Sequence, residues 1–220
     1  MTTMTRLDPL ELGTVLGVWA HPDDEAFLSA GITARITDAG GAVACLTATR
    51  GEEGSPDPVA WPPGRLGRRR ERELRAALSV VGVTDVYVLD HHDGTLDRVA
   101  VDDGAREVLD VMDAVAPDTV LTFGPDGLTG HPDHVAVSRW VTRACEWWGP
   151  SVRLLYATTT PEFARRWSAL HREINAFPPG LPLPTPLDRL AVDVEVAGDE
   201  LDRKLVSLSA HASQVRGLVD

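Results

Sequence analysis

The chain has 220 residues, 43% of them apolar, and its 21 basic and 33 acidic side chains give a net charge of −12. This length predicts one well-buried core, so we expect a single domain over residues 1–220. The acidic balance argues against nucleic acid or an anionic membrane surface as the main partner. No apolar run approaches the roughly 20 residues that span a bilayer, and the amino terminus lacks an apolar signal region. We therefore expect a cytoplasmic protein with no membrane insertion.

Short apolar runs alternate with helical patterns along the chain. In order, they predict strands at 14–20, 42–49, 85–90, 119–124, 153–159 and 190–196. The first four runs are almost continuously apolar, as expected of parallel strands covered on both faces. Apolar residues at helical spacing lie between them, for example Leu74, Ala77, Leu78 and Val81. This repeating β-α order predicts a Rossmann-like α/β sandwich, a mainly parallel sheet with helices on both faces.

Two segments rich in proline and glycine, 51–64 and 178–186, interrupt the alternation. The first follows a predicted strand at its carboxyl end, where open α/β sheets bind ligands, so we expect it to wall a site. The second either walls the same site or forms a contact between subunits of a homo-oligomer. The two cysteines, Cys45 and Cys145, fit no metal or redox spacing, and we expect both to be buried and reduced.

Two clusters repeat the order His-Pro-Asp: AHPDDE at 20–25 and TGHPDH at 129–134. Each follows a predicted strand, and proline is favoured at the first helical position, so His21 and His131 are the predicted helix caps. Capping accounts for the acids of the first cluster. It does not account for three histidines, because histidine is a poor cap. Since the carboxyl ends of parallel strands meet at one crevice, the clusters predict a shared site.

Two imidazoles and one carboxylate with an open position suit a catalytic zinc ion, although the same donors also suit Fe²⁺. We predict His21, Asp24 and His134 as ligands of one ion per chain, because a cap and the third helical residue lie together at a helix mouth. The helix dipole there favours ionised acids and neutral imidazoles, the forms that bind metal. Spacing alone does not decide which of Asp23 and Asp24 is the ligand.

Such a site suits hydrolysis of an amide by metal-activated water. An acid that does not bind the ion takes up the proton as general base. His131 assists the oxyanion and then donates a proton to the leaving amine.

The two motifs together resemble those of the PIG-L and LmbE-like zinc-dependent N-deacetylases, which include N-acetylglucosaminyl-phosphatidylinositol de-N-acetylase and the mycothiol and bacillithiol deacetylases. Further stretches occur in family-like order: TRGEEG at 49–54, RERELRAALSVVGV at 70–83, HHDG at 91–94 and HASQ at 211–214. The resemblance implies the fold and ligand set predicted above. It also implies that Asp23 is the general base, that His131 is the assisting histidine, and that Arg70 and Asp93 contact the substrate.

Local features bear on these implied roles. Arg70 falls on the buried stripe of its predicted helix, where a charge must reach a ligand or an internal partner such as Glu52 or Glu73. Asp93 is otherwise an ordinary turn residue, and His211 of HASQ a structural or pocket-wall residue. Mycothiol-type enzymes carry a tyrosine where this chain has Thr129.

The resemblance implies N-deacetylation of an N-acetylglucosamine-type amino sugar or its conjugate, a small-molecule partner. One alternative is an amidase acting on a larger N-acyl conjugate. A second is a non-haem Fe(II) oxygenase, which the alternation of strands and helices disfavours. A third is a dinucleotide-binding module. It is disfavoured because acids, which repel a pyrophosphate, follow the first strand in place of G-x-G-x-x-G.

Overall fold

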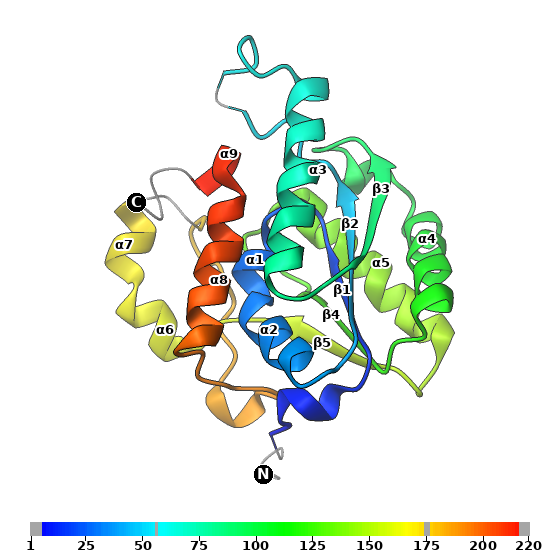
Figure 1. The fold of residues 1–220 in the computed structure, drawn as a ribbon, viewed down its shortest axis with the longest axis vertical. Helices are drawn as coiled ribbons and strands as arrows, with labels where there is room; N and C mark the ends of the chain where they lie inside the picture. The colour runs from blue at the N-terminus through cyan, green and yellow to red at the C-terminus, as the bar shows by residue number, and fades with distance from the viewer. Residues whose placement is uncertain (1–5, 56, 174–176, 216–220) are drawn as a thin grey trace.

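The computed structural model describes residues 6–55, 57–173 and 177–215. Its centre is a parallel sheet in the order β3-β2-β1-β4-β5, with helices on both faces (Figure 1). The strands are β1 (Val15–Trp19), β2 (Val43–Thr49), β3 (Asp85–His91), β4 (Thr119–Phe123) and β5 (Arg153–Ala157). The predicted Rossmann-like α/β class is confirmed. The first five predicted strands are also confirmed, with ends shifted by one or two residues.

Two groups of helices cover the sheet. The helices are α1 (Asp24–Leu28), α2 (Ala30–Asp38), α3 (Pro63–Val80), α4 (Val101–Val115), α5 (Pro132–Trp148), α6 (Pro161–Arg166), α7 (Ser168–Glu173), α8 (Asp199–Ala210) and α9 (Ala212–Val215). Short 3₁₀ turns are η1 (Pro9–Leu12), η2 (Leu96–Arg98) and η3 (Leu187–Arg189). Helices α4 and α5 pack together on one face, and α1, α2 and α3 lie with α8 on the other (Figure 1). The carboxyl-terminal α8 thus completes a layer begun by the first helices.

The strand order reverses at β1, which pairs with β2 on one side and β4 on the other. Val15 is in register with Val43 and with Thr119. Ligands of open α/β sheets bind beyond the carboxyl ends of the strands where the order reverses. The first His-Pro-Asp cluster directly follows β1, and the second lies in the connection from β4 to α5. The topology therefore brings both clusters to the same crevice.

The core lies between the sheet and its helices and contains large side chains such as Trp19, Phe123 and Trp140, each at most 1% exposed. The apolar stripe predicted on α3 is buried there, as expected of a helix whose apolar side chains recur at helical spacing. Cys45 and Cys145 are buried and form no disulfide, as predicted. Within the described ranges, the helices are all too short or too polar to cross a membrane.

The prediction of a strand at 190–196 is wrong. This segment has no ladder partner, and it packs beside α2, where Val196 lies against Gly31. Individual contacts hold the segment in place of a ladder: the Glu195 carbonyl accepts a hydrogen bond from Arg35, and Asp193 forms an ion pair with Arg6. Any extended segment with one buried side alternates apolar and polar residues, whether it pairs in a sheet or covers a helix. The alternation at 190–196 therefore comes from an extended segment that covers α2.

Candidate active site

The first cluster folds as a turn and not as a helix cap. Helix α1 begins only at Asp24, and Asp23 precedes it in the left-handed region with φ 109°. The Asp24 carboxylate accepts the His21 N–H at 2.8 Å, and the Asp23 carbonyl accepts the Ala26 and Phe27 N–H groups. The prediction that His21 caps this helix is therefore wrong, because the Asp24 side chain binds the His21 N–H and the helix begins two residues later than predicted.

The second cluster folds as predicted. Helix α5 begins at Pro132, and His131 is its cap, with Nδ1 accepting the Asp133 N–H at 3.2 Å. His134 is the third helical residue. Because Nδ1 of His131 is an acceptor, a neutral ring carries its proton on Nε2.

The two clusters meet beyond β1 and β4. Nδ1 of His21 lies 3.3 Å from Nε2 of His134 and 3.7 Å from a carboxylate oxygen of Asp24. The other Asp24 oxygen lies 3.4 Å from the same His134 nitrogen. Tetrahedral ligands at the usual zinc bond lengths are about 3.3 Å apart, so this spacing fits one small cation. The three side chains predicted as ligands are thus brought together, with only 8 or 9% of each residue exposed.

In His21 and His134, the ring nitrogen that faces away from the other two donors is hydrogen-bonded to a neighbouring group. Nδ1 of His134 lies 3.0 Å from the Gly127 carbonyl and 3.1 Å from the Thr129 hydroxyl. The ring also stacks on Phe123, with centroids 4.1 Å apart. A donor at Nδ1 leaves the Nε2 lone pair facing Asp24. This is the arrangement of histidines that bind metal.

Asp133 holds the other imidazole and was missed by the sequence analysis. Its carboxylate is fully buried and lies 3.2 Å from Nε2 of His21, and it accepts the Gly94 and Leu96 N–H groups. Asp93 lies 3.0 Å from the same nitrogen. Burial opposes the charged ring, but these hydrogen bonds and the nearby carboxylates raise the pKa of His21 to about 10. The repeated His-Pro-Asp order was the only signal in the sequence for Asp133.

Asp23 directly precedes Asp24 in the turn that follows β1. Its carboxylate accepts a hydrogen bond from Arg70 at 3.1 Å, and its side chain is 18% exposed. Burial and then the charge of Asp24 raise its pKa to about 7, although Arg70 opposes the shift. A carboxylate with this pKa can accept a proton near neutral pH and release it again.

Arg70 is buried, as predicted, at 4% exposure. It donates to the carbonyls of Gly51 and Pro22 at 2.6 and 2.5 Å, as well as to Asp23. Neither acid suggested as its internal partner takes that place; Glu73, for instance, pairs with the neighbouring Arg69. The structure therefore places Arg70 as a brace for the turn that presents Asp23.

The loop after β2 reaches the site at its base. Asp93 accepts the Glu53 N–H at 3.0 Å, and the Asp93 N–H is donated to Glu52 at 3.1 Å. The beginning of the 51–64 segment thus adjoins the site, whereas Val59 near its tip is 91% exposed. The 178–186 segment lies beside the second cluster, where Leu181 packs close to Gly130.

A second group that could hold a cation consists of His21, His131 and Asp133. In the described part of the chain it fits less well, because Asp133 already accepts two backbone N–H groups. His131 Nδ1 likewise accepts the Asp133 N–H. In the group of His21, Asp24 and His134, the only donor atom with a hydrogen bond to a described backbone N–H is the Asp24 oxygen that accepts the His21 N–H.

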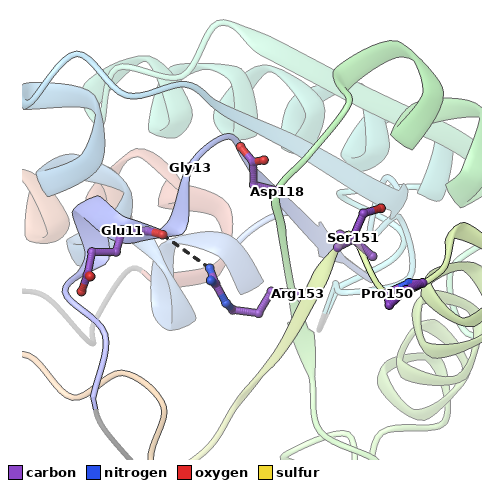
Figure 2. A pocket seen from close by; sticks show the side chains of 7 residues that line it. Glu11, Gly13, Asp118, Pro150, Ser151 and Arg153 are labelled. Carbon is purple, nitrogen blue, oxygen red and sulfur yellow. Dashed lines mark hydrogen bonds between the residues drawn. The ribbon is translucent and has the colours of Figure 1, made fainter.

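A separate hollow of about 530 Å³ opens at the amino ends of the strands. Figure 2 shows Glu11, Asp118 and Arg153 around it. Its polar groups are engaged with one another: Asp118 accepts the Thr14 N–H, and Arg153 reaches the Glu11 carbonyl. The hollow contains no histidine and lies at the opposite edge of the sheet from the two clusters.

A protein-family model described as GlcNAc-PI de-N-acetylase, PIG-L, matches residues 16–145. Two relatives named 1D-myo-inositol 2-acetamido-2-deoxy-alpha-D-glucopyranoside deacetylase are similar along most of the chain. The protein of Saccharomonospora viridis is 31% identical, over 91% of this chain and 85% of its own length. The protein of Actinosynnema mirum is 33% identical, over 91% of this chain and 80% of its own.

Solved structures share the fold. The N,N'-diacetylchitobiose deacetylase from Pyrococcus horikoshii superposes with a TM-score of 0.67 at 20% identity, over 94% of this chain and 72% of that one. The 4-carboxy-2-hydroxymuconate hydratase from Pseudomonas putida has a TM-score of 0.58 at 18% identity, over 93% and 84% of the two chains. Deacetylases and a hydratase thus share this architecture, so the fold by itself does not determine the reaction.

Proposed function

The chain belongs to the GlcNAc-PI de-N-acetylase family, PIG-L, and on that premise we propose that it is a metal-dependent N-deacetylase. Its substrate is an N-acetylglucosamine-type amino sugar or a conjugate of one. The observation that carries the proposal is the convergence of His21, Asp24 and His134, with the neighbouring Asp23 carboxylate held by Arg70. The deacetylase names of the sequence relatives support the reaction class.

His21, Asp24 and His134 would hold the cation, which we propose is zinc, with Fe²⁺ as the second candidate. Two imidazoles and one carboxylate match the donors of catalytic zinc sites. His134 would offer the ion its Nε2 lone pair, and His21 would give up to it the Nδ1 proton that the raised pKa of His21 keeps on its ring near neutral pH. A divalent cation held there acidifies a water molecule and polarises an amide carbonyl. The protein contributes the placement of the groups that move protons.

We assign the proton transfers to Asp23. This residue is the neighbour of Asp24, its side chain is 18% exposed, and its pKa is about 7. It accepts the proton of the attacking water and, once protonated, supplies that proton to the departing amine. Arg70 holds the carboxylate in place through its hydrogen bond.

His131 acts on the substrate oxygen. Burial lowers its pKa, and its Nδ1 is engaged by the Asp133 N–H, so the neutral ring presents Nε2–H as a donor. This N–H stabilises the oxygen that gains negative charge when water adds to the amide carbon. Asp23 is the better proton donor for the amine, because a neutral imidazole that gave up its proton would become an anion.

We propose that Asp93 and Arg70 recognise the sugar. Asp93 lies 3.0 Å from His21 and accepts the Glu53 N–H of the loop after β2, and we propose that a sugar hydroxyl binds its carboxylate. The two relatives named above act, by their names, on an acetamido sugar joined to inositol. Thr129 replaces a tyrosine of mycothiol-type enzymes, and a smaller residue there leaves room for a different aglycone.

The test is a substrate panel with the purified protein loaded with Zn²⁺ or Fe²⁺. It contains N-acetylglucosamine, its inositol and chitobiose conjugates, larger N-acyl conjugates, and a non-amide analogue of each. We expect release of acetate and free amine from at least one N-acetyl sugar, and none after chelation. The proposal fails if the metal-loaded protein hydrolyses no N-acyl sugar. Release of a longer acyl group alone would indicate the amidase, and oxygen-dependent turnover with 2-oxoglutarate the oxygenase.

A further inference from the structure

A buried carboxylate, Glu25, lies between Asp23 and the last helices of the chain. One of its oxygens accepts the Asp23 N–H at 3.0 Å, and the other lies 2.6 Å from Nε2 of His211. Glu25 is 3% exposed and His211 is fully buried. A carboxylate is costly to bury without partners, so these contacts are what allow Glu25 to occupy this position.

The backbone of Asp23 requires support. With φ at 109° it adopts a conformation that residues with a side chain rarely occupy, and such conformations persist only when the surroundings hold them. The Asp23 carbonyl accepts the N–H groups of Ala26 and Phe27. Glu25 holds the N–H on the other side of the same residue. The direction of the Asp23 side chain depends on this conformation, because φ and ψ set where the carboxylate points.

The support for Glu25 comes from the side chain of His211, the first residue of the HASQ stretch. His211 follows α8, and the next turn is anchored to α3 by Ser213, whose hydroxyl and N–H both bond to Glu73. Helix α3 also carries Arg70, which holds the Asp23 carboxylate. The carboxyl-terminal segment therefore reaches the turn through Glu25, while α3 reaches it through Arg70.

We propose that Glu25 and His211 are positioning residues of the deacetylase: Glu25 fixes the Asp23 turn through its N–H, and His211 fixes Glu25. This inference rests on the proposed function. It assigns a catalytic purpose to a motif at the carboxyl end of the chain, about 190 residues away from the base (from Asp23 to His211).

The test compares Glu25→Ala with Glu25→Gln and His211→Phe in the metal-loaded protein. Glu25→Ala removes the acceptor, so kcat should fall about tenfold to a hundredfold while KM stays nearly constant, because the base is misplaced and substrate binding is not. Glu25→Gln keeps an oxygen for the Asp23 N–H and should restore most of kcat. His211→Phe should fall between them. Metal content should equal that of the wild type in all three.

Ser213→Ala is the matched control, because it loosens the same carboxyl-terminal turn without touching Glu25. It should lose stability yet keep kcat. If it lost kcat as Glu25→Ala does, the effect would come from general loosening and the inference would be overturned. A folded Glu25→Ala protein with wild-type kcat would overturn it as well.

Crystal structures of wild type and Glu25→Ala provide a readout that needs no substrate. We expect Asp23 to relax to negative φ in the variant and its carboxylate to leave Arg70. An unchanged Asp23 turn would overturn the inference even if no substrate were ever found. Should Glu25→Ala fail to fold, the same comparison is made with His211→Phe. Wild-type protein that hydrolyses no N-acyl sugar would instead overturn the proposed function, which separates the two failures.

Discussion

The two His-Pro-Asp clusters contain the same three residues in the same order, yet they fold in different ways. The second starts a long helix in the ordinary manner, with His131 as cap and Pro132 in the first turn. The first makes a turn with Asp23 in a left-handed conformation before a helix of five residues. The histidine that opens the first cluster lies in the group that could hold a metal ion, whereas in the second cluster the member of that group is the closing His134.

The aspartates differ even more. Asp133 is fully buried and makes hydrogen bonds to two backbone N–H groups and to His21. Asp23 keeps part of its carboxylate open, and burial raises its pKa to about 7. The motif thus gives a fully buried carboxylate in one copy and, in the other, a partly exposed carboxylate that we propose as the proton acceptor. Which one results depends on the backbone that carries the motif.

The largest expected effect is the difference in metal content and activity between variants of His21 and His131, the first residues of the two His-Pro-Asp sequences. His21→Ala removes a donor of the cation, so metal and activity should both be lost. His131→Ala should keep the metal and lose about 10²- to 10³-fold in kcat, the usual loss when one donor to the oxyanion is removed. Metal analysis of both dialysed proteins together with steady-state kinetics checks this. Equal metal loss in the two variants would mean that the second group of donors, which includes His131, holds the ion.

Asp23→Asn should lower kcat by about 10²- to 10⁴-fold, the range associated with losing a general base. The amide preserves the size of the side chain and an acceptor for Arg70, so the fold and the metal content should not change. Kinetics and metal analysis at one pH are sufficient. Loss of the metal would show that Asp23 and Asp24 have exchanged the roles proposed for them.

Asp133→Asn changes the matching residue of the other cluster and should act on the metal and not on proton transfer. Removing a charged partner of a ligand imidazole typically weakens metal binding by about 10- to 100-fold. With saturating metal, kcat should recover most of its wild-type value, which Asp23→Asn cannot do. Competition with a chelator measures the affinity. A kcat that stays low at every metal concentration would contradict this assignment.

The smallest expected effect is a difference in the free energy of unfolding that depends on the backbone conformation of Asp23. Asp23→Gly and Asp23→Ala both lose the carboxylate, but only glycine adopts φ near 109° without strain. The glycine variant should be more stable than the alanine variant by about 1 kcal/mol, the cost of placing a Cβ in the left-handed region. The same pair at Asp133, which is helical, should show the reverse order. Urea unfolding of the four proteins measures both differences.

Much of the fold could be predicted because it depends on local periodicity. Continuous apolar runs identified β1 to β4, and apolar spacing on α3 placed Arg70 on its buried side. The strand at 190–196 was predicted wrongly for the same reason. An alternating pattern indicates that one face is buried, but it does not indicate whether a sheet or a helix covers that face. The start of α1 was also misplaced, because the Asp24 side chain competes for the His21 N–H in a way that residue preferences do not capture.

The sequence by itself determined which chemical groups are present and that both clusters follow parallel strands, so that one crevice receives three imidazoles and several carboxylates. The tertiary structure decided which nitrogen of each ring is free, that Asp133 supports His21 from 112 positions away, and that His211 reaches Glu25. The physical reason is the range of the interactions. Periodicity and capping act within a few residues, whereas hydrogen bonds between side chains depend on strand register and on how distant helices pack.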